Sequence, residues 1–144
     1  EVRMLSRSLN NDVILNIGFE QSITNELNRL KRMKFSSAEL HIKGDKKELP
    51  NKKHEIVIFR ILQEFFSNSV KYSEAKNLQI VLDYQEKQLI IKASDDGNGF
   101  DMESTDKGAG LINMESRAEL VNAIFELYSK PNEGVQLTLT YPYQ

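Results

Sequence analysis

The chain has 144 residues, 40% of them hydrophobic and 28% charged, which suits one domain with a buried core and leaves too little for two. Lys and Arg number 19 against 21 Asp and Glu, a net charge of -2, so no broad basic surface for nucleic acid is expected. The absence of cysteine excludes a disulfide framework, a thiolate zinc site and cysteine catalysis. No apolar run approaches the ~18 residues of a membrane span, so we expect no direct membrane contact by this chain.

The first residues, from Val2 to Leu9, have the apolar spacing of the end of an amphipathic helix that begins upstream. We therefore expect a fragment of a longer protein, with the end of an upstream helix and a linker in residues 1–17 and one domain in residues 18–144. Two polar runs, Asn10-Asn11-Asp12 and Asn16-Ile17-Gly18, are expected to break the helical pattern before that domain.

The rest of the chain alternates between helical and strand periodicity. Helices are predicted up to Met33, from Leu49-Pro50 to about Tyr72, and from Leu111 to about Asn122. Strands are predicted at residues 37–43, 77–84, 88–94, 124–129 and 135–141, with a polar loop at residues 100–107. This order predicts an α+β fold, a two-layer sandwich with about three helices on one face of a mixed, mostly antiparallel sheet.

The long predicted helix carries a polar stripe made of Glu64, Asn68 and Lys71. At ~100° per residue these side chains fall within about 60° of one another, and the large apolar residues lie opposite. A solvated face is the ordinary explanation for such a stripe. Here Val57 and Ile61 lie on or beside it, so Glu64 and Asn68 are expected to be only partly hydrated. Partly buried polar groups indicate a ligand, a metal or a partner.

Two glycine-containing stretches follow the stripe. Asp95-Asp96-Gly97-Asn98-Gly99-Phe100 closes a predicted strand, and Gly108-Ala109-Gly110-Leu111 opens the last predicted helix. Each alone is an ordinary turn or connector. Glycine also lets the backbone approach a flat ligand, and a helix N-terminus offers free N–H groups to phosphate. Together with the polar stripe, the two stretches indicate a nucleotide site.

These residues resemble the catalytic, ATP-binding domain of bacterial sensor histidine kinases, within the GHKL ATPase superfamily. The closest similarity is to the subgroup that pairs with response regulators of the helix-turn-helix output type, and it runs from about Leu49 to Tyr141. Residues 60–64 with Asn68 and Lys71 resemble the N box, and residues 95–100 and 108–118 the first and second glycine boxes. The last glycine box is reduced to Gly134, which we expect to touch neither base nor phosphate.

The resemblance implies how an adenine nucleotide would be held. Asp95 would accept a hydrogen bond from the adenine amino group, and Gly97 and Gly99 would let the backbone lie close to the base. Asn68 would ligate the Mg²⁺ that bridges the phosphates. Lys71 would compensate the phosphate charge.

The resemblance also implies the remaining parts of a phosphotransfer site. Gly108 and Gly110 would let the loop fold over the triphosphate, with the helix that begins at Leu111 aimed at it. Residues 102–107 would form a lid. Glu64 would orient or deprotonate the attacking imidazole.

The activity implied is transfer of the γ-phosphate of Mg-ATP to a histidine in an upstream dimerisation and histidine phosphotransfer domain, and onward to a cognate response regulator. Besides that domain and the regulator, ATP and ADP are the expected partners. A cytoplasmic location is expected, whether or not the parent protein is anchored in a membrane. His41 is expected on the solvent side of its strand and His54 at the surface, about 15 Å from Glu64 along the helix.

Two alternatives remain open. A serine kinase of the anti-sigma-factor type would share the fold and the site, but the helix end at residues 1–9 disfavours it. A non-catalytic ATP-sensing interaction module would need Asn68 but has no use for Glu64, so the presence of both residues disfavours that module.

Overall fold

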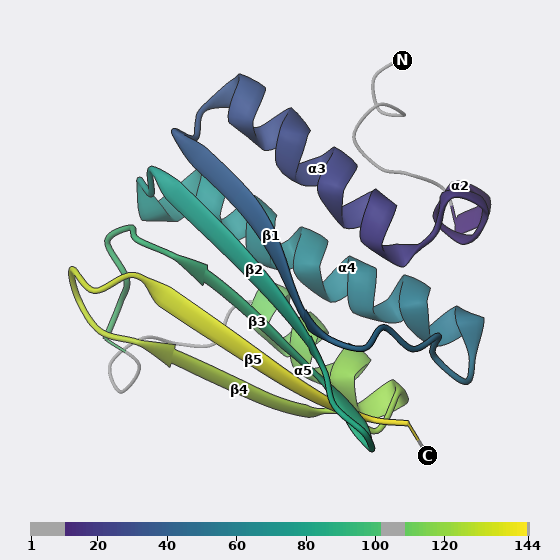
Figure 1. Ribbon diagram of the computed structural model, residues 1–144. Helices are drawn as coiled ribbons and strands as arrows, with labels where there is room; N and C mark the ends of the chain where they lie inside the picture. The colour runs from purple at the N-terminus through teal and green to yellow at the C-terminus, as the bar shows by residue number, and fades with distance from the viewer. Residues whose placement is uncertain (1–10, 102–108, 144) are drawn as a thin grey trace.

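The protein is described by a computed structural model that covers residues 11–101 and 109–143. Figure 1 shows two layers, with helices packed on one face of a single sheet. The helices are α2 (Asn11–Ile17), α3 (Phe19–Met33), α4 (Lys52–Asn68) and α5 (Ala109–Leu120), and α4 continues into a π-helical turn, Ser69–Ser73. The strands are β1 (Ser37–Gly44), β2 (Asn77–Tyr84), β3 (Gln88–Asp95), β4 (Ile124–Ser129) and β5 (Val135–Pro142).

The sheet has the strand order β1-β2-β3-β5-β4. β1 and β2 are parallel, and the other neighbouring strands are antiparallel. The predicted α+β sandwich with a mixed, mostly antiparallel sheet is therefore confirmed. β3 is the middle strand, and its last residue, Asp95, lies opposite Leu78 of β2 and Val135 of β5. The end of β3 is thus held by a strand on either side.

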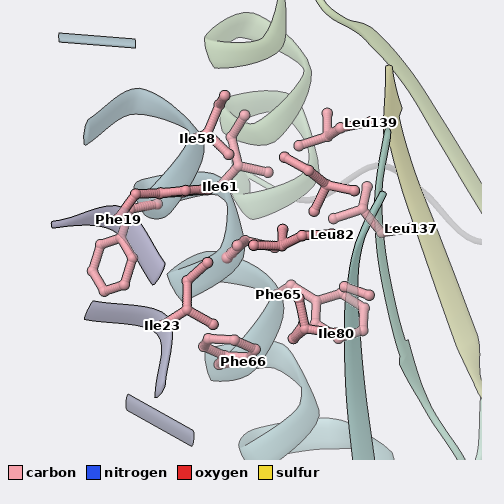
Figure 2. Close-up of a cluster of buried hydrophobic side chains, with 14 of the residues drawn as sticks. Phe19, Ile23, Ile58, Ile61, Phe65, Phe66, Ile80, Leu82, Leu137 and Leu139 are labelled. Carbon is pink, nitrogen blue, oxygen red and sulfur yellow. The ribbon is translucent and has the colours of Figure 1, made fainter. Parts of the chain in front are cut away.

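The core lies between α4 and the sheet (Figure 2). Because α4 contacts α3 along one side and α5 along the other, it is apolar most of the way round, as the sequence predicted. Ile61, which was expected on or beside the polar stripe, is fully buried. The fully or almost fully buried members from α4 and the strands include Ile58, Phe65, Phe66, Ile80, Leu82, Leu137 and Leu139.

Helix boundaries differ from the prediction at several places, and α5, for example, covers Ala109–Leu120 and not Leu111 to about Asn122. The expected break at Asn11-Asp12 is wrong, because these residues begin α2, whose Ile14 is fully buried in the core. Asn and Asp are favoured at helix starts as well as in turns, so the polar run was ambiguous. The long helix begins at Lys52 and not at Leu49-Pro50, because Asn51 has extended backbone and its side chain accepts a hydrogen bond from the Lys53 N–H.

Two predicted features lie outside the described residues. They are the helix end at residues 2–9 and the lid at residues 102–107, which is most of the predicted polar loop. Within residues 11–101 and 109–143, no helix is long and apolar enough to cross a membrane.

Candidate functional site

The polar stripe occupies the C-terminal turns of α4 and the π-helical turn that follows. Glu64 and Asn68 are half-buried, as predicted, and Lys71 is exposed. Within the described residues, none of these three side chains forms a hydrogen bond or an ion pair. The helix widens directly after Asn68, where the backbone changes from α- to π-helical geometry. Such π-turns are frequent at functional sites.

Asp95 is joined to this stripe by a buried hydrogen bond. The Ser69 hydroxyl donates to Asp95 Oδ2 over 2.6 Å, and the Gly97 N–H donates to Oδ1 over 3.0 Å. Ser69 and Asp95 are both buried, and Ser69 directly follows Asn68. The bond therefore brings the end of the α4 stripe against the end of β3. Ser69 was missed by the sequence analysis, because a single serine in a helical pattern carries no distinctive signal.

The neighbouring Asp96 has a different environment. Its carboxylate accepts hydrogen bonds from the backbone N–H groups of Lys76 and Asn77, over 2.8 and 2.9 Å, and from the Asn77 side chain. Burial alone would raise the pKa of Asp96, but these hydrogen bonds outweigh burial and hold its pKa below the ordinary value. Asp96 thus fixes the entry to β2.

Gly99 and Gly134 pack the first glycine stretch against the β4–β5 hairpin. Gly99 has a φ of 64°, and a Cβ there would collide with the carbonyl oxygens of Lys130 and Gly134. Gly134 has a φ of 76°, and a Cβ there would collide with the Asp95 carbonyl oxygen. Gly134 therefore supports Asp95, a role that the sequence analysis did not assign to it.

Ser129 completes this junction from β4. It accepts a hydrogen bond from the Phe100 N–H over 2.9 Å and donates one to the Gly134 carbonyl over 2.8 Å. Gly97 is buried at the same junction, and its N–H is used by Asp95. The backbone after β3 is thus held on both sides of Gly97.

The first turn of α5 lies against Glu64. A Cβ built on Gly110 would collide with Glu64 Oε2, so the carboxylate and the backbone of α5 are in direct contact. Leu111 follows in the same turn and is half-buried. A negative charge is favoured at a helix N-terminus because the backbone N–H groups there are free. Gly108, the first residue of the predicted phosphate loop, lies outside the described residues.

A cavity of about 470 Å³ opens beside the stripe, between α3, α4 and α5. Glu64, Ser67 and Lys71 form its α4 wall, and Arg60 and Arg117 stand next to them. Asp95, Gly97 and Asn68 do not line it. The cavity thus adjoins the stripe at Glu64 and Lys71 and does not include the predicted base contacts.

The two histidines lie away from Glu64. His41 is exposed, as predicted. The expectation of a surface position for His54 is wrong, because this side chain is half-buried and its Nδ1 lies 2.6 Å from the Tyr141 hydroxyl. It stands in the first turn of α4, about 15 Å from Glu64 by helix rise. In residues 11–101 and 109–143, His, Asp and Glu side chains form no cluster of three or more that could hold a metal ion.

Comparison with known proteins identifies the family. Residues 53–144 match the family described as histidine kinase-, DNA gyrase B-, and HSP90-like ATPases. The oxygen sensor histidine kinase NreB of Staphylococcus carnosus is 37% identical over 90 residues, which cover 61% of this chain and 26% of NreB. The chain thus spans about a quarter of the length of this curated relative.

Solved structures show the same fold at low sequence identity. The blue-light activated histidine kinase of Erythrobacter litoralis EL346 has a TM-score of 0.67 at 14% identity, over 85% of this chain and 40% of that one. The Acinetobacter baumannii histidine kinase AdeS has a TM-score of 0.67 at 17% identity, over 88% of this chain and 64% of that one. The chain therefore belongs to the family of histidine kinase-, DNA gyrase B- and HSP90-like ATPases, and its fold is that of the ATP-binding domain of histidine kinases.

Proposed function

We propose that this chain binds Mg-ATP at the junction of α4 and β3 and supplies the γ-phosphate to a histidine of an upstream domain. The observation that carries the proposal is the buried hydrogen bond between Ser69 and Asp95. It holds the Asp95 carboxylate beside the helix turn that bears Asn68, which supports a shared site for base and phosphates. Ser69 and Asp95 are 26 residues apart in the sequence, and the fold brings them into contact.

Asp95 reads the base. An ionised carboxylate has about four acceptor positions, and Ser69 and Gly97 use two of them. The remaining acceptor capacity suits the adenine amino group, whereas guanine offers a carbonyl oxygen at the same ring position. Gly97 and Gly99 keep the backbone beside Asp95 free of side chains.

The phosphates lie along the polar stripe. The side-chain oxygen of Asn68 fits Mg²⁺, which prefers oxygen ligands and is commonly held by one or two protein groups plus phosphate oxygens. When bound, the ion would neutralise part of the triphosphate charge. The exposed Lys71 ammonium adds positive charge, and Gly110 and Leu111, in the first turn of α5, present its N-terminus to the phosphates. Gly108, which lies outside the described residues, would let the preceding loop fold over them.

Glu64 acts on the acceptor. It precedes Asn68 by one helical turn, about 6 Å of rise, so the reacting imidazole would meet it next to the metal-bound phosphates. Its carboxylate makes no hydrogen bond within the described residues and can orient the imidazole or take its proton. The bond between the γ-phosphorus and the oxygen of the leaving ADP breaks as the phosphorus–nitrogen bond forms. Positioning and charge neutralisation provide most of the catalysis in such a transfer.

The acceptor and the signalling partners lie outside the described residues. His54 is bonded to Tyr141 and His41 faces solvent, so neither is placed to receive the phosphoryl group. We propose an upstream dimerisation and histidine phosphotransfer domain as acceptor, a response regulator of the helix-turn-helix output type as the next partner, and a cytoplasmic location. The division into residues 1–17, a helix end with a linker, and the catalytic domain 18–144 stays a proposal, and the buried Ile14 shows that α2 packs on that domain.

Radiolabelled ATP tests the proposed transfer. The longer parent protein is expected to acquire acid-labile label on a histidine upstream of Asn11, and this chain alone should not label itself. Glu64→Gln should slow labelling by about 100-fold or more and leave MgADP affinity nearly unchanged, because Glu64 acts on the imidazole. Acid-stable label on serine or threonine would support the anti-sigma-factor-type kinase. MgADP binding without any label would support the non-catalytic ATP-sensing module.

A further inference from the structure

Three arginines line the cavity beside Glu64, one from each surrounding helix: Arg29 of α3, Arg60 of α4 and Arg117 of α5. Arg60 precedes Glu64 by one turn of α4, and Arg117 follows Gly110 by two turns of α5. At ~100° per residue each pair lies on one face of its helix. Glu64 contacts Gly110, and Arg60 and Arg117 lie farther along the same α4–α5 contact, one turn before Glu64 and two turns after Gly110. The proximity of Arg117 adds to burial in lowering the pKa of Arg60.

The three guanidinium groups differ in their partners. Arg29 forms an ion pair with Glu26 over 2.6 Å, so its charge is matched on α3 itself. Arg60 donates to Gln63 Oε1 over 2.6 Å. Arg117 makes no hydrogen bond or ion pair with any described residue. The cavity lining has four basic side chains, Arg29, Arg60, Lys71 and Arg117, and two acidic ones, Glu26 and Glu64, so it is positively charged in a chain of net charge -2.

We expect the guanidinium groups of Arg60 and Arg117 to lie near the turn that carries Glu64. Long side chains on a helix lean toward its N-terminus, so we expect the guanidinium of Arg117 to extend back along α5 toward Gly110. The bond to Gln63 carries the head of Arg60 forward along α4, toward Glu64. Along α4 the order is therefore Asn68, Glu64 and then the two guanidinium groups. Asn68 does not line the cavity, but Glu64, one turn away, does, so a nucleotide held at Asn68 would reach this positive end of the cavity with its last phosphate.

We propose that Arg117, with Arg60 beside it, binds the terminal phosphate of ATP and holds it against Glu64. The inference rests on the proposed nucleotide site at Asp95 and Asn68 and adds a residue that distinguishes ATP from ADP. ADP lacks the terminal phosphate, so it has nothing to place between the two guanidinium groups. Arg suits this role because its planar fork donates two parallel hydrogen bonds to phosphate oxygens.

Calorimetric titration of this chain with MgADP and with a magnesium complex of a non-hydrolysable ATP analogue tests the inference. Arg117→Gln is expected to weaken binding of the ATP analogue by about tenfold to 100-fold, the effect of one charged hydrogen bond, and to leave MgADP binding unchanged. Arg60→Gln should act in the same direction, and Arg117→Lys should restore part of the loss because it keeps the charge without the fork. Arg29→Gln is the matched control from the same cavity and should change neither titration.

The outcomes separate the inference from the nucleotide site itself. If Arg117→Gln and Arg60→Gln weaken both nucleotides equally, or neither, the terminal-phosphate role is refuted while the nucleotide site stands. If the unaltered chain binds neither MgADP nor the ATP analogue, the nucleotide site fails, and the inference fails with it. Circular dichroism of each variant verifies that a change in binding is not a change in folding.

Discussion

Substitution of Gly110 by alanine should separate catalysis from folding. A Cβ at Gly110 would collide with Glu64 Oε2, would lie 3.1 Å from Glu64 Cδ, and would be in ordinary contact with Cγ at 3.5 Å. Only the end of the Glu64 side chain therefore has to move, and the stem and the α4–α5 packing can stay. Gly110 lies in the first turn of α5 and has no positive φ, so alanine fits its backbone.

The expected magnitudes follow from these contacts. Alanine is favoured over glycine in a helix by up to about 1 kcal/mol, and an off-rotamer Glu64 would cost about as much, so the free energy of unfolding should stay within about 1 kcal/mol of the parent. A displacement of about 1 Å at a catalytic group can slow a reaction by about 100-fold. Gly110→Ala should therefore fold normally and transfer phosphate very slowly.

Urea unfolding of this chain and radiolabel transfer in the longer parent protein measure the two effects. Glu64→Gln provides the control background, because the carboxylate that alanine would displace is already absent there. Addition of Gly110→Ala to Glu64→Gln should cost little further activity. Full transfer activity in Gly110→Ala, or a loss of several kcal/mol in stability, would refute the contact between Gly110 and Glu64 as the reason for this glycine.

Three further outcomes are expected. Ser69→Ala removes the hydroxyl that fixes Asp95, so urea unfolding should show a loss of about 1–3 kcal/mol and calorimetry a weaker MgADP affinity, and unchanged values would contradict the role of this bond. Gly134→Ala should lower both quantities, because its φ is 76° and its Cβ would meet the Asp95 carbonyl. Glu55→Gln should raise the thermal midpoint at pH 7. Burial raises the Glu55 pKa above 4.5, so the stability that the protonated side chain contributes is lost as pH rises through that raised pKa. The advantage of Glu55→Gln should vanish at pH values below 4.5, and an advantage that persists there would contradict this origin.

The strands and the polar stripe could be predicted because each leaves a periodic signal. Residues 77–84 form β2 as expected, and β3 extends one residue beyond its predicted end, to Asp95. The stripe was visible because Glu64 and Asn68 recur at helical spacing on an otherwise apolar helix. Local periodicity is thus sufficient for the strands, for the longer helices and for the residues that they display.

The supports of the site could not be predicted, because they depend on contacts between distant segments. Ser69 gains its role only when Asp95 is placed beside it, and Gly134 only when the β4–β5 hairpin packs on the end of β3. Helix α2 was missed because its polar first residues suit a turn as well as a helix start, and the choice is made by the burial of Ile14. Tertiary packing decided each of these features.

Base selectivity tests the central claim most directly, namely that Asp95 belongs to an adenine nucleotide site. Calorimetric titration of this chain with MgADP and MgGDP compares two ligands that differ only in the base. MgADP should bind about tenfold to 100-fold more tightly, the effect of one charged hydrogen bond, and Asp95→Asn should lose most of that preference without loss of fold. Equal affinity for the two nucleotides in the unaltered chain would contradict the assignment of Asp95 as the residue that reads the base.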